Sequence, residues 1–145
     1  MSLTAIDTNI LLYALNRDFP EYETARVWLD ARRRDPDTVV SELVLVELYV
    51  LVRNPSVFRR PLGAVDAAAV IASYRRHPAW RIVDHEPGVM EGVWERASVA
   101  DFARRRIFDV RLALGLIRHG VTQLATRNIG DFQGLGFEKV WNPLA

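Results

Sequence analysis

Cysteine is absent from this 145-residue chain, and lysine occurs only once, at Lys139. Without cysteine the chain can form neither disulfide bonds nor thiolate metal sites, and this composition is compatible with a reducing compartment. No apolar run approaches the roughly 18 residues that a membrane-spanning helix needs. The apolar N-terminal stretch lacks a basic segment and is interrupted by Asp7, so we expect no signal peptide and a cytoplasmic protein.

The common nucleotide-binding and hydrolase motifs are also missing. The chain contains no G-x-x-x-x-G-K-[ST], no G-x-G-x-x-G and no G-x-S-x-G, which argues against P-loop, dinucleotide-binding and α/β-hydrolase sites. The histidines, His77, His85 and His119, are scattered beside expected turns and helix ends. A structural role is the more common one for histidines in such places. Carboxylates are therefore the better candidates for catalysis.

The overall composition is that of an ordinary globular protein. Hydrophobic residues make up 50% of the chain, and 19 basic and 18 acidic residues give a formal net charge of +1. A chain of this length can bury roughly 68–70% of its unfolded surface, and we expect a single domain over residues 1–145. Arginines cluster at residues 32–34, 59–60, 75–76 and 104–106. These clusters fit either solvated helix ends or a surface that binds the phosphates of a nucleic acid.

Short apolar segments alternate with longer amphipathic ones along the chain. Strands are expected at residues 3–6, 38–40, 80–83, 122–126 and 137–141, and helices at residues 9–15, 22–33, 43–53, 65–76, 89–103 and 108–119. Segment 43–53 is rich in β-branched residues, but its length and the flanking Ser41 and Pro55 favour a helix. The alternation predicts an α/β fold, with a parallel sheet covered by helices on both faces. Functional sites of such sheets lie at the carboxyl ends of the strands.

Four acidic residues are expected at that carboxyl edge. Asp7 follows the first strand, and Asp131 follows the fourth. Glu47 lies near the start of the helix after the second strand, and Asp109 begins the helix before the fourth. Taken singly, Asp7 could be a helix N-cap, Asp109 could be stabilised by the helix dipole, and Asp131 could be a turn residue.

Taken together, the four carboxylates would repel one another unless a cation lies among them. Ligation by oxygen alone selects Mg²⁺ or Mn²⁺ over zinc or copper. The natural substrate of such a site is a phosphodiester.

Glu47 has the most unusual setting of the four. It is the only charged residue between positions 43 and 52, in a segment that is hydrophobic on all sides and therefore expected to be buried. A buried carboxylate must be paired, protonated or bound to a cation. No basic residue lies one helical turn away on either side. We therefore expect Glu47 either to pair with an arginine from elsewhere in the fold or to serve a metal ion.

Several segments resemble the PIN-domain ribonucleases, and within them most closely the VapC toxins of bacterial toxin–antitoxin pairs. The segments are A-I-D-T-N-I-L, S-E-L-V-L-V-E-L, N-P-S-V-F, F-D-V-R-L-A, T-R-N-I-G-D-F-Q-G-L-G and the closing W-N-P-L. Each is weak alone, but together and in this order they are specific, and they extend over nearly the whole chain. The resemblance implies a three-layer α/β/α sandwich with a mostly parallel sheet, dependence on Mg²⁺ or Mn²⁺, and cleavage of RNA. It also implies inhibition by a VapB-like antitoxin and, in most such toxins, a homodimer.

Carried over residue by residue, the resemblance assigns the acidic site to Asp7, Glu47, Asp109 and Asp131. It also places Thr8 beside the first acid and Asn128 before the last, as polar residues that support the carboxylates.

The chain departs from the family pattern in several places. Glu42 stands where relatives often have proline, which adds a fifth acid near the site, and Arg111 stands where a small residue is common. Asn128 stands where relatives often carry an acid, which would leave a second metal poorly held. Asp101 is a rival to Asp109, but it lacks the helix start that follows Asp109.

Three other functions stay open on the sequence. The chain could be a PIN-type nuclease that cleaves DNA or processes RNA without an antitoxin. It could be an inactive module that binds RNA or protein, although the presence of all four acids argues against this. It could also be a phosphatase that uses Asp7 as its nucleophile.

Overall fold

A parallel sheet forms the centre of the molecule. The structure is a computed structural model that describes residues 2–145, and within them the sheet has five strands in the order β3-β2-β1-β4-β5, with every neighbouring pair parallel. The strands are β1 (Leu3–Ile6), β2 (Thr38–Ser41), β3 (Arg81–Val83), β4 (Val121–Ala125) and β5 (Lys139–Trp141). Because β1 lies between β2 and β4, the residue that follows β1 emerges at the middle of the carboxyl edge.

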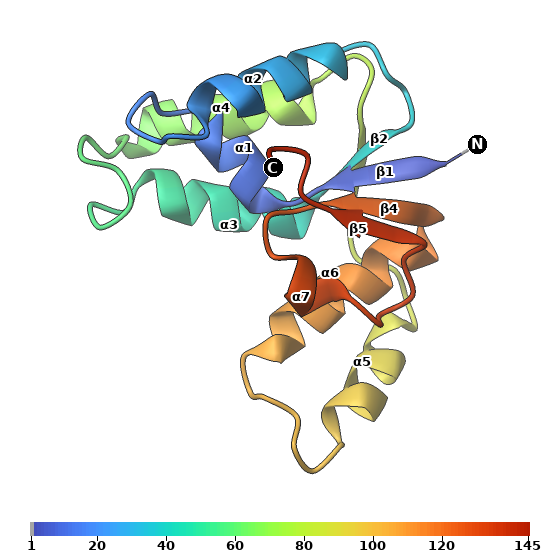
Figure 1. Ribbon diagram of the computed structural model, residues 1–145. Helices are drawn as coiled ribbons and strands as arrows, with labels where there is room; N and C mark the ends of the chain where they lie inside the picture. The colour runs from blue at the N-terminus through green and yellow to red at the C-terminus, as the bar shows by residue number, and fades with distance from the viewer. Residues whose placement is uncertain (1) are drawn as a thin grey trace.

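Helices cover both faces of the sheet, which confirms the predicted three-layer α/β/α fold. The helices are α1 (Thr8–Tyr13), α2 (Tyr22–Ala31), α3 (Glu42–Val52), α4 (Ala64–Arg75), α5 (Val89–Ala97), α6 (Arg106–Arg118) and α7 (Ile129–Phe132). Figure 1 shows α1 to α4 on one side of the sheet and α5, α6 and α7 on the other. Across residues 2–145, no helix is both long and apolar enough to cross a membrane.

The hydrophobic core lies on both faces of the sheet. Val40 and Leu124 are fully buried in β2 and β4, and they pack with buried helix residues such as Leu11, Leu48 and Leu116. Burial of each such side chain contributes roughly 1.5–3 kcal/mol. Strands that are buried on both faces lack the alternation of polar and apolar residues, which explains why these segments read as short apolar runs.

Most of the expected elements begin and end within two residues of their predicted limits, but two predictions need correction. Helix α5 ends at Ala97, not at residue 103. At that point the Ser98 hydroxyl donates a 2.7 Å hydrogen bond to the Glu95 carbonyl, and such local bonds compete with continuation of a helix. The short helix α7 was not predicted, because its residues around Gly130 looked like a turn.

Helix α3 is not buried on all sides, contrary to the sequence prediction. Leu45 and Leu48 are buried, but Val46 is 63% exposed, Val50 is 57% exposed, and Glu47 is exposed between them. The hydropathy of the segment did not indicate this exposure, because the outward positions of α3 carry valine, which has the hydropathy of a core residue. The prediction that Glu47 is buried is therefore wrong. Helix α2 shows the same feature, because its apolar residue Val27 is 68% exposed.

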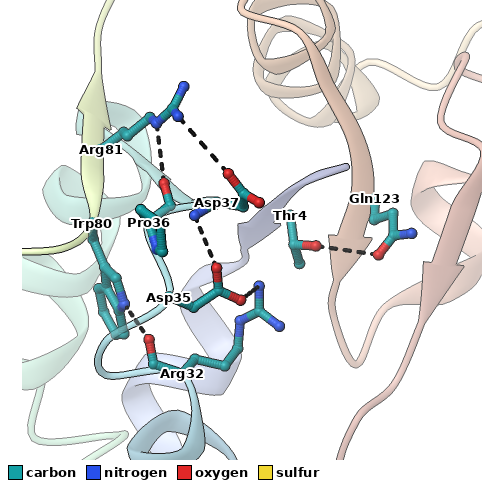
Figure 2. A network of polar contacts seen from close by, with 8 residues as sticks. All are labelled: Thr4, Arg32, Asp35, Pro36, Asp37, Trp80, Arg81 and Gln123. Atoms are coloured by element: carbon teal, nitrogen blue, oxygen red, sulfur yellow. Dashed lines mark hydrogen bonds and ion pairs between the residues drawn. The ribbon is translucent and has the colours of Figure 1, made fainter. Parts of the chain in front are cut away.

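Polar contacts hold together the opposite, amino edge of the sheet (Figure 2). An Arg32 nitrogen lies 3.3 Å from the Asp35 carboxylate, and the Trp80 indole donates a 2.9 Å hydrogen bond to the Arg32 carbonyl. Arg81 Nε donates a 3.1 Å hydrogen bond to the Pro36 carbonyl. Arginines at this edge therefore have structural partners, which favours the helix-end interpretation for the cluster at residues 32–34.

Candidate active site

Asp7 stands at the junction of β1 and α1, on the carboxyl edge of the sheet. Its backbone N–H donates a 3.0 Å hydrogen bond to the Ala125 carbonyl of the neighbouring strand β4. Its side chain is the N-cap of α1 and accepts a 2.8 Å hydrogen bond from the Thr8 N–H. Only 6% of Asp7 is exposed. Asp7 is therefore a helix cap, as one sequence interpretation held, but capping accounts for only one of its two carboxylate oxygens.

The other oxygen of Asp7 is held by residues that were not predicted as site residues. The buried Thr126 hydroxyl donates a 2.7 Å hydrogen bond to Asp7 Oδ2, and the Asn9 amide lies 3.4 Å from the same oxygen. Asn9 in turn accepts a 3.1 Å hydrogen bond from the Arg127 N–H, and Thr126 accepts one of 3.0 Å from the Asn128 N–H. These contacts fix the orientation of the Asp7 carboxylate. Both missed residues are polar and lie close to the carboxyl end of a strand, Thr126 directly after β4 and Asn9 in the first turn of α1, and that signal could have identified them.

The electrostatics of Asp7 and Asp109 link the four predicted acids. The pKa of Asp7 is raised to about 6, chiefly by burial; the hydrogen bonds from Thr126 and Thr8 oppose the rise, and the charges of Glu47 and Asp109 contribute to it. Burial also raises the pKa of Asp109, and the charges of Asp131 and Glu47 act in the same direction. Each of the four acids thus interacts with at least one of the others, and the charge of Arg106 opposes this repulsion only at Asp109.

The four acids come from different elements and differ in exposure. Glu47 is exposed on the second turn of α3, Asp109 is half-buried in the first turn of α6, and Asp131 is exposed on α7. Asp109 and Asp131 line one cavity of about 420 Å³. Within residues 2–145, no three histidine, aspartate or glutamate side chains are grouped closely enough to hold a metal ion.

The donor set nevertheless fits a hard cation. Every available ligand is an oxygen, and the Asp7 carboxylate is held in place with no cationic partner among its contacts. Mg²⁺ is commonly bound through one or two carboxylates, with waters and substrate phosphates completing its shell. Acids that are not grouped closely around one point are compatible with that mode of binding, because only one or two of them need to contact the ion directly.

The fifth acid, Glu42, has a partner outside the site. Its Oε1 lies 2.6 Å from Arg75 Nε, so it connects α3 to α4. Asp101 lines a different cavity from the one that contains Asp109. The two predicted supporting residues contact the site through their backbones, because Thr8 donates its N–H to Asp7 and Asn128 donates its N–H to Thr126.

Comparisons with known proteins agree with the fold and with the order of the motifs. The model of the PIN domain family matches residues 4–136. Ribonuclease VapC24 of Mycobacterium tuberculosis strain H37Rv is 49% identical over 142 residues, which cover 98% of this chain and 97% of VapC24.

Two solved structures share the fold at low sequence identity. VapC20 of Mycobacterium tuberculosis, described as a sarcin–ricin loop cleaving toxin, matches with a TM-score of 0.66 and 22% identity over 92% of this chain and 95% of its own. DNA-bound VapBC from Salmonella typhimurium matches with a TM-score of 0.64 and 16% identity over 99% of both chains.

Proposed function

This chain belongs to the PIN-domain family and, within it, to the VapC ribonucleases, and we propose that it is a metal-dependent endoribonuclease that acts as the toxin of a toxin–antitoxin pair. The observation that carries the proposal is the setting of Asp7. Its buried carboxylate is held by fixed hydrogen bonds and interacts with the charges of Glu47 and Asp109. Such a group favours binding of a cation, and the 49% identity to Ribonuclease VapC24 over nearly the whole chain supports RNA as the substrate.

The four acids have different proposed roles. Asp7, Asp109 and Asp131 hold Mg²⁺ or Mn²⁺ directly or through water, and Glu47 either joins them as a ligand or orients the attacking water. Thr126 and Asn9 keep the Asp7 carboxylate in one orientation, as residues behind metal ligands commonly do.

The metal and the protein contribute separately to the reaction. When bound, the ion supplies Lewis-acid chemistry toward the phosphodiester. The protein would contribute the carboxylates that hold the ion, the buried Asp7 and the half-buried Asp109, at a negatively charged edge of the sheet. Without the ion, these carboxylates would repel the phosphate.

The proposed partners are RNA, a VapB-like antitoxin and a second copy of this chain, and the proposed location is the cytoplasm. The acidic edge would attract an arginine or lysine side chain from an antitoxin. Support for the homodimer comes from apolar side chains that α3 leaves exposed, Val46 and Val50. Sedimentation of the purified chain tests the dimer, and co-purification with the product of a neighbouring small gene tests the antitoxin.

The activity itself is tested by incubating total RNA with the purified protein in EDTA, Mg²⁺ and Mn²⁺. We expect cleavage only with a divalent ion, and we expect Asp7→Asn to abolish it while the fold is retained, because the change removes a charge and little volume. Full cleavage in EDTA, or cleavage by the Asp7→Asn variant at the parental rate, would refute the proposed site.

A further inference from the structure

Phe108 is an exposed aromatic side chain beside Asp109, at the start of α6. It is 67% exposed, whereas Val110 is buried and Ile107 packs against the core. Helix α6 is therefore anchored by other residues and does not need Phe108 for its packing. Phe108 lines the same cavity of about 420 Å³ as Asp109 and Asp131.

Two arginines complete this cavity, Arg105 and Arg106. Within residues 2–145, the arginines of the cluster at 104–106 form no ion pair, whereas Arg32, Arg75 and Arg81 all do. The Nε atom of Arg106 is buried and has no hydrogen-bond partner among the described residues. Arg105 and Arg106 are thus free of ion pairs and can bind an anionic group, although the charge of Arg106 also acts on Asp109. At the amino edge, Arg32 and Arg81 are already engaged by Asp35 and Asp37.

We propose that this cavity is a nucleobase subsite for single-stranded RNA, in which one base stacks on Phe108 while Arg105 and Arg106 bind an adjoining phosphate. An aromatic face next to unpaired arginines is the usual combination for unstacked bases and their backbone. The subsite would place the neighbouring phosphodiester beside Asp109 and Asp131. Bases within a duplex cannot reach Phe108, so the subsite selects single strands, loops or ends. This inference rests on the proposed ribonuclease function for its biological meaning, but its test is independent of cleavage.

Binding is measured in EDTA, where no cleavage is expected, with a single-stranded oligoribonucleotide that carries 2-aminopurine and with the same sequence as a duplex. We expect Phe108→Ala and Phe108→Leu to weaken single-strand binding by about 10- to 100-fold, and Phe108→Tyr to retain it, since stacking requires an aromatic ring. The 2-aminopurine fluorescence should change on binding to the parent and not to Phe108→Leu. Trp94→Ala is the matched control, because Trp94 is 59% exposed on α5 and lies outside this cavity.

A second measurement tests the arginines. The salt dependence of single-strand binding should become shallower by about 0.7 in log–log slope for Arg105→Ala, the value for loss of one phosphate contact. Arg34→Ala, in the turn at the opposite edge of the sheet, should leave the slope unchanged.

Three results would overturn the subsite. One is single-stranded RNA that binds neither the parent nor the Asp7→Asn variant, in which one of the charges that repel the phosphate in EDTA is removed. Another is a Phe108→Leu variant that binds like the parent. The third is a Phe108→Ala variant that alters only the sedimentation of the protein, which would make Phe108 a protein contact. Failure of the ribonuclease proposal is distinct, because it would appear as absence of cleavage with Mn²⁺ while the binding differences among the Phe108 variants persist.

Discussion

The Thr126 hydroxyl donates a 2.7 Å hydrogen bond to the carboxylate of Asp7, although the two residues are 119 positions apart in the chain. Each directly follows a strand residue of the central pair, because Ile6 of β1 is in register with Ala125 of β4. Parallel pairing of these strands thus brings both side chains to the same edge. The hydrogen bond also opposes the effect of burial on the pKa of Asp7, so the strand register bears directly on the chemistry of the carboxylate.

Replacing Thr126 with valine should therefore affect both stability and titration. Thr126→Val keeps the shape but removes the donor to Asp7 and the acceptor of the Asn128 N–H. We expect a loss of about 2 kcal/mol in the free energy of unfolding at neutral pH in EDTA. The pKa of Asp7 should rise further above its ordinary range. Urea denaturation at several pH values measures both effects.

Thr38→Val is the matched control for that experiment. The Thr38 hydroxyl is buried in β2 and has no hydrogen-bond partner among the residues that the structure describes. Its removal leaves no new unpaired group, so the free energy of unfolding should stay the same or rise. Equal losses in the two variants would show that the hydrogen bond to Asp7 has no special importance.

The stability of the metal-free protein should fall as the pH rises. The pKa of Asp7 is raised from 3.8 to about 6, so between these values the folded chain binds more protons than the unfolded chain. The stabilising contribution of Asp7 is fully present below the unfolded pKa and is lost as the pH rises through about 6. The loss amounts to about 3 kcal/mol.

Asp7→Asn isolates this effect, because asparagine does not titrate. In EDTA, the difference in unfolding free energy between variant and parent should grow in favour of the variant from pH 4 to pH 7. If the unfolding free energies of parent and variant change with pH in the same way, Asp7 is not the group that makes stability depend on pH.

An antitoxin segment should protect the carboxyl edge of the sheet. The negative charge shared by Asp7, Glu47 and Asp109 favours a basic side chain of the partner. Hydrogen exchange of the co-purified complex should show protection at the starts of α1 and α6 and along α3, and RNA binding should be lost. Protection confined to the amino edge, near Arg32 and Arg81, would argue for a different docking surface.

Much of the fold could be predicted from the sequence because its local signals agree with one another. Ser41 caps α3, and its hydroxyl accepts a 3.1 Å hydrogen bond from the Leu43 N–H. Gly120 has a φ of +89° after α6, as expected for a residue that ends a helix. Alternation of such helices with apolar strands leaves few arrangements other than a parallel sheet. The carboxyl ends of parallel strands lie at the same edge, so the position of the acids at that edge could be predicted as well.

The details of the site were less predictable, because they depend on contacts between distant segments. Nothing local to Thr126 indicates that it donates to Asp7, since the contact requires the pairing of β1 with β4. The exposure of Glu47 was hidden for a different reason. Its neighbours Val46 and Val50 are apolar but face outward, and hydropathy alone cannot separate an outward valine from a core valine.

The exposure of Glu47 sharpens its proposed role. Glu47 forms no ion pair within residues 2–145, so the alternative of a buried pair with an arginine does not hold. Glu47→Gln should therefore leave the melting temperature in EDTA unchanged or slightly raised, because it relieves repulsion toward Asp7 and Asp109. If Glu47 serves the metal, the affinity for Mn²⁺ and the rate of RNA cleavage should both fall by at least about tenfold. The weaker affinity would appear as a smaller rise in melting temperature on addition of Mn²⁺.

Glu42→Gln is the matched control for Glu47→Gln, because it makes the same change on the same helix. Glu42 pairs with Arg75, which is largely exposed, so the loss of stability should be at most about 1 kcal/mol. Neither stabilisation by Mn²⁺ nor cleavage should change, since Glu42 is directed toward α4. Thermal melts of the parent and both variants, each in EDTA and in Mn²⁺, separate the two acids. If Glu47→Gln is stabilised by Mn²⁺ as strongly as Glu42→Gln and cleaves RNA at the same rate, Glu47 belongs neither to the metal site nor to the catalytic apparatus.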